Sequence, residues 1–196
     1  MCKLVIASNN IHKIQEIQEI LGDRFPEILS ATEAGIMEEI PETGDSFLEN
    51  AIEKATYVHR LTDCSVLADD SGLEVEALHG APGIHSARYC GQHGKDMENN
   101  LLLLRNMEGV KNRKANFVCY IVLLQPGKAA LVARGDCPGE LLTEPRGNGG
   151  FGYDPLFYLP KLGKTMAELS PKEKNKISHR RQALDNLRNI IEGKCE

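Results

Sequence analysis

Residues 4–21 read LVIASNNIHKIQEIQEIL and predict the first strand, turn and helix of the fold. The apolar run at 4–7 is typical of a buried strand, and the polar turn Ser8-Asn9-Asn10 follows it at once. From residue 11 onward isoleucines recur at helical spacing, which indicates an amphipathic helix. A strand that leads directly into a helix favours an α/β fold.

The start of this helix is suited to binding an anion. Its first turn presents free backbone N–H groups and the positive end of the helix dipole, and Lys13 adds a full charge beside them. The alternative is that Ser8 or Asn9 only caps the helix while Lys13 faces solvent. The spacing by itself leaves both interpretations open.

A second informative stretch is LADDSG at residues 67–72. An apolar run followed at once by two acids predicts a strand over 65–68 that ends at Asp69 and Asp70. Adjacent strand residues point to opposite faces, so one carboxylate can pair inward while the other projects into a cleft. Carboxylates in that position suit Mg²⁺. The alternative is an ordinary Asp-Ser-Gly turn.

The remaining patterns add helices and a hairpin to this start. A capping box at 46–49 opens a helix, residues 101–104 belong to another helix, and 179–191 form an amphipathic helix. The glycine-rich stretch 80–94 predicts a loop. The apolar runs 117–124 and 129–133, joined by Gln125-Pro126-Gly127-Lys128, predict a β-hairpin. Together they predict an α/β domain over 1–196 with a mixed sheet.

Residues 149–155, GGFGYDP, combine three glycines with two aromatic side chains and an acid. Such glycine density lets the backbone approach a ligand closely, and an aromatic ring offers a stacking face for a base. The alternative is a structural turn in which Phe151 and Tyr153 fill the core. Both interpretations remain open from composition.

Residues 170–181, SPKEKNKISHRR, begin with a capping box that has proline at the first helical position. Most basic runs of this kind are solvated faces. In a chain whose formal net charge is −5, a local basic cluster is nevertheless a candidate contact for phosphate or a base.

The composition excludes several classes of protein. A net charge of −5 speaks against general nucleic-acid binding. No apolar run approaches the roughly 18 residues of a membrane span, and no leader precedes residue 4, so we expect a cytoplasmic protein. The six cysteines form no C-x-x-C pair, which predicts reduced thiols and argues against a cysteine-based metal site.

Taken in order, the motifs resemble the inosine triphosphate pyrophosphatase family, whose members hydrolyse non-standard purine nucleoside triphosphates such as ITP, dITP and XTP. The resemblance runs from Leu4 to about Leu187. One departure is Asn9, where the family usually has the glycine of Thr-Gly-Asn. The motifs are Ser8-Asn9-Asn10-x-x-Lys13, Glu42-Thr43-Gly44, Phe47-x-Glu49-Asn50-Ala51, Ala68-Asp69-Asp70-Ser71-Gly72-Leu73, Gly80-Ala81-Pro82-Gly83-Ile84-x-Ser86-Ala87-Arg88-Tyr89, Phe151-Gly152-Tyr153-Asp154 and Ile177-Ser178-His179-Arg180.

The resemblance implies a long curved mixed sheet flanked by helices, two lobes with a central substrate cleft, and a homodimer. It implies that Glu42 and Asp70 bind Mg²⁺ and that Asp70, with Asp69 as the alternative, deprotonates the attacking water. The purine would stack on Phe151. The further substrate-binding positions would be Ser8, Asn9, Asn10, Lys13, Ser71, Gly152, Tyr153, Asp154, Lys174, His179 and Arg180.

Among these positions, His179 and Arg180 would donate hydrogen bonds to the 6-keto group that distinguishes hypoxanthine and xanthine from adenine. Residues 86–89 are expected to serve as scaffold or dimer contact. Two other hypotheses stay open: a pyrophosphatase of related fold that acts on modified pyrimidine triphosphates, and a nucleotide sensor that binds without turnover. The expected partners are a small purine nucleoside triphosphate and a second copy of the chain, with neither nucleic acid nor membrane.

Overall fold

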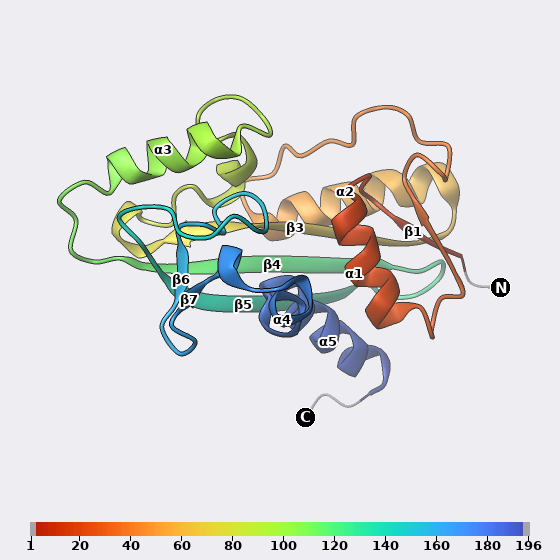
Figure 1. Cartoon of the computed structure of the whole chain (residues 1–196). Coiled ribbons are helices and arrows are strands. Elements are labelled where there is room, and N and C mark those ends of the chain that lie inside the picture. Colours follow the sequence, from red (N-terminus) through yellow and green to blue (C-terminus); the bar gives the residue numbers. More distant parts are fainter. Residues whose placement is uncertain (1–2, 194–196) are drawn as a thin grey trace. The chain divides into compact units, whose positions relative to one another are not determined.

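The computed structural model describes residues 3–193 and contains a seven-stranded mixed sheet with helices packed on it (Figure 1). The strand order is β2-β1-β3-β4-β5-β6-β7. β1 pairs in parallel with β2 and β3, whereas β6 pairs antiparallel with β5 and β7. The strands are β1 (Lys3–Ile6), β2 (Glu27–Ser30), β3 (Ser65–Val75), β4 (Lys114–Leu124), β5 (Leu131–Leu141), β6 (Phe157–Leu159) and β7 (Lys164–Thr165).

Five α-helices and three short 3₁₀ segments complete the described elements. The α-helices are α1 (Ile11–Leu21), α2 (Phe47–Thr62), α3 (Asp96–Asn106), α4 (Pro171–Ile177) and α5 (His179–Ile191). The 3₁₀ segments are η1 (Glu76–Leu78), η2 (Gly83–Arg88) and η3 (Met166–Glu168).

The chain divides into two compact units. Unit 1 comprises the residues up to Asp70, Cys119–Gly135 and the residues from Arg180 onward, and unit 2 comprises Ser71–Val118 and Asp136–His179. β3, β4 and β5 each contribute residues to both units. The two expected lobes therefore correspond to two units of the fold, while the single domain over 1–196 and the central cleft stay predictions.

Unit 1 has helices on both faces of its strands. Along β1 and β3, alternate side chains point to opposite sides. Leu4 and Leu67 join the cluster that includes apolar residues of α1 and α5, whereas Val5 and Val66 join the cluster built with α2. Side chains with odd and even numbers on β3 therefore meet different helices.

Unit 2 has its own apolar core, to which α3 contributes Leu103 and to which Met107, directly after the helix, also belongs. The Phe117 and Phe157 rings pack at the centre of this core with centroids 4.5 Å apart and planes tilted by 44°. The buried side chains of this core all belong to unit 2, so the loops of unit 2 pack on a core within their own unit.

Most predicted elements are present, and the exceptions have physical reasons. The helices 11–21 and 179–191, the helix opened by Ser46 and the hairpin around Gln125 are confirmed. The prediction that a strand ends at Asp69 was wrong, because β3 continues to Val75. The predicted loop 80–94 contains η2. β2, β6 and β7 were not predicted, since two to four residues show no clear alternation.

Two expectations about composition can be compared with the described residues. Between residues 3 and 193, no helix combines the length and apolarity that crossing a bilayer requires. Cys64, Cys90, Cys119 and Cys137 are free thiols, as expected, and Cys2 and Cys195 lie outside the described residues.

Candidate active site

Asp69 lies on β3 between two cations of unit 1. Its side chain is only 1% exposed, and its carboxylate pairs with Lys13 Nζ at 2.9 Å and with Arg180 Nε at 3.3 Å. Burial alone would raise the pKa of Asp69, but the attraction of Lys13, Arg180 and Lys54 outweighs it and holds the pKa well below its usual range. Asp69 is thus a fixed anion that orients Lys13.

Asp70 points to the opposite face of β3, toward α2. Its Oδ2 accepts a hydrogen bond from Asn50 Nδ2 at 3.0 Å, and its Oδ1 lies 3.5 Å from Lys54 Nζ. Burial raises the pKa of Asp70, and the attraction of Lys54 and the hydrogen bond from Asn50 only partly offset it. A carboxylate whose pKa is raised is better suited to accept a proton from water than the fixed anion Asp69.

Lys54 links the two carboxylates predicted to bind the metal. Its Nζ lies 2.6 Å from Glu42 Oε1 and 3.5 Å from Asp70 Oδ1, and its side chain is 5% exposed. Burial would lower the pKa of Lys54, but Asp70, Asp69 and Glu42 outweigh burial and raise it. The Glu42 and Asp70 carboxylates therefore both face the Lys54 ammonium group, at a position where the protein stabilises a positive charge.

Oxygen donors that converge on a cation in this way fit Mg²⁺, which takes one or two carboxylates and completes its shell with water and phosphate oxygens. No group of three or more His, Cys, Asp or Glu side chains suited to a metal occurs among the described residues. Glu42 and Asp70 are thus compatible with a magnesium shared with substrate, and not with a closed protein cage.

Asn50 and Lys54 were both missed by the sequence analysis. They share the face of α2 that carries Ala51, Ala55 and Val58, all of which are buried. A lysine on the apolar face of a helix was the available signal, since it needs carboxylate partners inside. Asn50 also ties down the Glu42 segment, because its Oδ1 accepts a hydrogen bond from Gly44 N at 2.8 Å.

Gly44 lets this segment approach α2 closely. A Cβ atom added at Gly44 would lie 2.6 Å from Glu49 Cβ and 3.0 Å from Asn50 N, so any side chain would force the segment away. The glycine of Glu42-Thr43-Gly44 therefore helps to keep Glu42 near Lys54.

The side chains of the turn Ser8-Asn9-Asn10 hold it in place by accepting hydrogen bonds. Ser8 Oγ accepts from Asn10 N at 3.1 Å, and Asn10 Oδ1 accepts from Lys13 N at 3.3 Å, so Asn10 caps α1. Asn9 Oδ1 instead accepts from Thr32 N and Thr32 Oγ1 at 2.9 and 2.8 Å. Asn9 is not among the described residues with positive φ, so the departure from glycine does not strain the turn.

In unit 2, Asp154 organises the loop that carries Phe151. Its carboxylate is buried, accepts from Phe151 N at 2.9 Å and pairs closely with Lys174 Nζ. A Cβ atom at Gly150 would meet Asp154 Oδ2 at 2.0 Å, and φ at Gly150 is +73°, so this position requires glycine.

The two aromatic side chains of this loop have different surroundings. Phe151 is 48% exposed, and Lys174 Nζ lies over its ring at 4.2 Å from the centroid. Tyr153 is buried in the core of unit 2 and its hydroxyl donates to Ser86 O at 2.8 Å. Phe151 thus offers a stacking face, and the prediction that Tyr153 binds substrate is corrected, because its side chain belongs to the core.

The remaining predicted positions lie on β3, α5 and the Ser178 break. Ser71 follows Asp70 on β3 as the first residue of unit 2. His179 is 9% exposed and stacks on Phe117, with ring centroids 5.0 Å apart. Ser178 separates α4 from α5 in an extended conformation.

Arg180 lies in unit 1, whereas His179 is the last residue of unit 2. Arg180 Nη1 pairs with Glu16 Oε2 at 2.9 Å, and Nε pairs with Asp69. The side chain is 3% exposed. The structure thus brings Arg180 together with Asp69 and Lys13, and its predicted contact with the purine stays a prediction.

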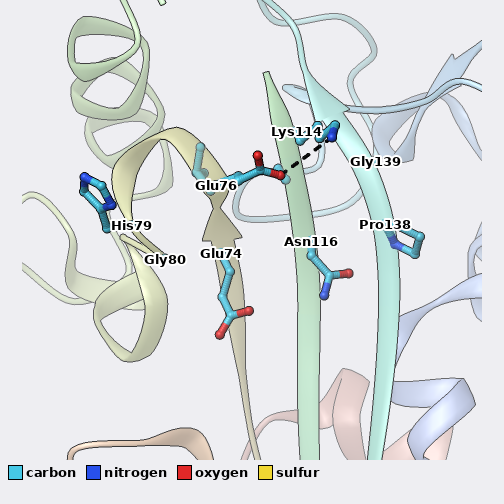
Figure 2. Close-up of a pocket in the computed structure, with 10 residues that line it drawn as sticks. Glu74, Glu76, His79, Gly80, Lys114, Asn116, Pro138 and Gly139 are labelled. Carbon is cyan, nitrogen blue, oxygen red and sulfur yellow. Dashed lines mark ion pairs between the residues drawn. The ribbon is translucent and has the colours of Figure 1, made fainter. Parts of the chain in front are cut away.

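A cavity of about 520 Å³ in unit 2 contains none of the predicted site residues. Figure 2 shows its lining residues, with Glu74 on β3, Asn116 on β4 and an ion pair between Glu76 and Lys114, whose atoms are 3.9 Å apart. The candidate site residues are accordingly those of the buried charge networks, around Asp69 and Asp70 in unit 1 and around Asp154 in unit 2, and not those that line a cavity.

Similarity to known proteins extends over almost the whole chain. The chain is 48% identical to a dITP/XTP pyrophosphatase of Clostridium perfringens, covering 98% of both chains, and 45% identical to that of Escherichia coli, covering 96% of this chain and 100% of the other. Among solved structures, the Ham1 protein of Staphylococcus aureus has a TM-score of 0.91 at 43% identity, covering 98% of this chain and 100% of the other.

A HAM1 protein of Coxiella burnetii gives the same result, with a TM-score of 0.92 at 43% identity and the same coverage. The profile of the Ham1 family matches residues 4–190, which include every predicted site residue. With the fold and the relatives in agreement, this chain belongs to the Ham1 family.

Proposed function

We propose that the protein hydrolyses non-standard purine nucleoside triphosphates, dITP and XTP together with ITP, to the nucleoside monophosphate and pyrophosphate. The observation that carries this proposal is the match, over nearly the full length of both chains, to proteins named dITP/XTP pyrophosphatase. The enzyme would thereby keep these nucleotides out of nucleic acids. The charge networks of the two units supply chemistry that fits the reaction.

Unit 1 is assigned the triphosphate and the hydrolytic step. Lys13 and the first turn of α1 would hold phosphate oxygens, because a helix N-terminus and a cation both favour anions. Glu42 and Asp70 would hold Mg²⁺, which when bound neutralises negative charge on the phosphates.

Asp70 is proposed as the general base. It would accept a proton from a water molecule whose oxygen bonds to the α-phosphorus, while the bond to the oxygen that bridges the α- and β-phosphates breaks and pyrophosphate leaves. Lys54 supports this role by holding the Asp70 carboxylate in place and balancing its charge. Asp69, fixed by Lys13 and Arg180, serves as an anchor.

Unit 2 is assigned the purine. The half-exposed Phe151 ring offers a stacking face, and Lys174 covers part of the ring and pairs with Asp154. Stacking contributes roughly 1–3 kcal/mol but does not distinguish bases. His179 of this unit is therefore proposed to donate to the 6-keto group, and the family resemblance adds a donor from Arg180.

The test is pyrophosphate release from dITP, XTP, ITP, GTP and ATP, with modified pyrimidine triphosphates in the same panel and Mg²⁺ present or removed by a chelator. We expect rapid release from dITP, XTP and ITP, slow release from ATP and GTP, and loss of release without the metal. Asp70→Asn, which keeps the shape but not the charge, is expected to abolish turnover.

Each other result identifies a different function. Preference for pyrimidines would favour the related pyrophosphatase. Saturable binding of ITP without release would favour a sensor. A loss of only a few-fold in kcat in Asp70→Asn would contradict the role of Asp70 as the base.

The resemblance also supports a cytoplasmic homodimer, which we include in the proposal. Sedimentation of the purified chain over a range of concentrations tests the dimer. A monomer that retains full activity would contradict it.

A further inference from the structure

The loop that presents Phe151 is held by α3 as well as by Asp154. Gly152 donates its N–H to Asp96 Oδ2 at 2.7 Å and accepts a hydrogen bond on its carbonyl from Asn100 Nδ2 at 2.8 Å. Asp96 and Asn100 are four residues apart on α3 and so lie on one face of that helix. Both backbone polar groups of Gly152, its N–H and its carbonyl, are therefore hydrogen-bonded to side chains of α3.

These hydrogen bonds restrain a residue that packing leaves free. Gly152 has φ of +61°, and a Cβ atom built on it would meet nothing within 4 Å, so close packing around the α-carbon does not fix its backbone. Glycine is the residue with the largest choice of backbone conformations. The conformation of Gly152 is therefore set by Asp96 and Asn100.

The restraint acts directly on Phe151. On its N-terminal side, Phe151 N is bonded to the buried carboxylate of Asp154. On its C-terminal side, the next residue is the one that α3 holds. The ring itself is half exposed, so its direction depends on the backbone at both sides.

We propose that Asp96 and Asn100 are positioning residues that fix the backbone of the Phe151 loop so that the ring is preorganised to stack on the purine. The inference rests on the proposed function, in which Phe151 contacts the base. Preorganisation strengthens binding because less freedom is lost when the ligand arrives. Without the contacts from α3, the residue that follows Phe151 would lose both of these backbone hydrogen bonds.

The structure also explains why an asparagine can serve at position 100. Its Oδ1 is buried without a hydrogen-bond partner among the described residues, so the amide acts through its donor alone. Asn100→Leu keeps the approximate volume and removes both the useful donor and the unpaired acceptor. We therefore expect this variant to fold with little change in Tm.

Asp96→Ala gives the second variant, with Glu98→Ala as its matched control. Asp96 and Glu98 are the two acidic residues in the first turn of α3 and both are exposed, so each substitution removes the same favourable charge at the helix start. Only Asp96 contacts Gly152. Asp96→Asn retains an acceptor oxygen and is the conservative replacement expected to restore wild-type behaviour.

The main measurement is steady-state hydrolysis of dITP and XTP. We expect Asp96→Ala and Asn100→Leu each to raise KM about 3- to 10-fold, the equivalent of one hydrogen bond, with kcat unchanged. Such a pattern reports weaker binding of ground state and transition state alike. Inhibition by inorganic tripolyphosphate, which has no base to stack, is expected to stay as in wild type, and Glu98→Ala is expected to match wild type throughout.

Hydrogen exchange of the peptide containing residues 149–156 separates this inference from the proposed function, because it needs no substrate. Faster exchange there in Asp96→Ala, and not in Glu98→Ala, is expected. If wild type releases no pyrophosphate from dITP or XTP, the proposed function fails whatever the exchange shows. If wild type is active and both variants keep its KM, or if kcat and tripolyphosphate inhibition fall together with Tm, the inference is overturned.

Discussion

Asp69 and Asp70 are neighbours on β3, yet their surroundings give them opposite pKa shifts. The alternation of strand side chains sends Asp69 toward Lys13 and Arg180, and Asp70 toward Asn50 and Lys54. Two cations near Asp69 outweigh the effect of burial, whereas one amide and one lysine near Asp70 do not. A single strand thereby holds an anchor and a candidate base side by side.

The raised pKa of Asp70 predicts how stability depends on pH. A carboxyl group whose pKa is higher in the folded chain keeps its proton longer than in the unfolded chain, where the value is about 3.9. Wild type therefore loses stability as the pH rises from the unfolded value through the folded value. Asp70→Asn does not titrate, so its Tm is expected to exceed that of wild type at neutral pH, and this gain shrinks below about pH 4.

Scanning calorimetry at acidic and neutral pH measures this difference. Asp45→Asn, at an exposed carboxylate, is the control and is expected to follow the wild-type curve at both pH values. A Tm for Asp70→Asn that equals or falls below that of wild type at neutral pH would contradict the raised pKa.

The Lys13 ammonium group has two roles. It pairs with the buried Asp69 carboxylate, and it is proposed to bind the phosphates. Lys13→Ala is expected to weaken binding of a triphosphate about 10- to 100-fold, the size of a charge-assisted contact, and binding of the monophosphate much less. The substitution also removes the ion pair between Lys13 and the buried Asp69 carboxylate, while the ion pair with Arg180 stays. Because a buried charge then loses one of its partners, Tm is expected to fall. Calorimetric titration with non-hydrolysable ITP and with IMP measures the two affinities.

The double variant Lys13→Ala with Asp69→Asn separates the two roles of Lys13. Removing the buried charge is expected to restore Tm without restoring triphosphate affinity. Equal weakening of triphosphate and monophosphate would show that Lys13 serves the base or only the fold.

His179 and Arg180 are the first two residues of α5, directly after the break at Ser178, and they have different surroundings. His179 lies against the Phe117 ring in unit 2, and Arg180 pairs with Asp69 and Glu16 in unit 1. The extended conformation at Ser178 ends α4, and both side chains lie in the first turn of α5, where adjacent residues point in different directions. Their contributions to base selection can therefore differ.

Substitutions at these two positions test base selection. If both donors read the 6-keto group, His179→Ala and Arg180→Ala each lower kcat/KM for ITP and XTP much more than for ATP. If Arg180 acts only through Asp69, its substitution lowers the rates for all three nucleotides by the same factor. Survival of the ITP to ATP ratio in both variants would assign selection to residues 151–154 instead.

The elements that the sequence predicted best are those whose pattern is local. Helix spacing and caps depend on residues within a few positions, so the bounds of α1 and α5 and the start of α4 were predicted nearly correctly. β3 was cut short because two acids look like a strand end, and only their distant partners Lys13 and Lys54 allow them inside a sheet. Long-range pairing of this kind leaves no local pattern.

The same reason explains which site residues were missed. Asp70, Lys13 and Asn50 stand in recognisable motifs, but the role of Asn50, and Lys54 altogether, become apparent only when the buried face of α2 is known. Tyr153 and Phe151 are equivalent by composition. They differ only in their long-range contacts. The hydroxyl of Tyr153 donates a hydrogen bond to Ser86 O within unit 2, whereas the ring of Phe151 lies under the Lys174 ammonium group.

The connection between the two units predicts how the whole molecule unfolds. The chain passes from one unit to the other after Asp70, Val118, Gly135 and His179, and the first three of these passages lie inside β3, β4 and β5. A strand that is frayed in one unit loses ladder hydrogen bonds at the point where it enters the other. We therefore expect the two units to unfold in one cooperative transition, although each has its own core.

Urea unfolding followed by circular dichroism, with hydrogen exchange of peptides from β1 in unit 1 and β6 in unit 2, measures this coupling. One midpoint is expected for all three probes. A core substitution in unit 2, Leu103→Ala, is expected to cost about 2–5 kcal/mol and to lower the midpoint of the β1 peptide as much as that of the β6 peptide. The exposed Leu162→Ala in the same unit is the control and leaves both midpoints unchanged. Separate midpoints, or a shift confined to β6, would mean that each unit folds alone and that the three shared strands do not couple them.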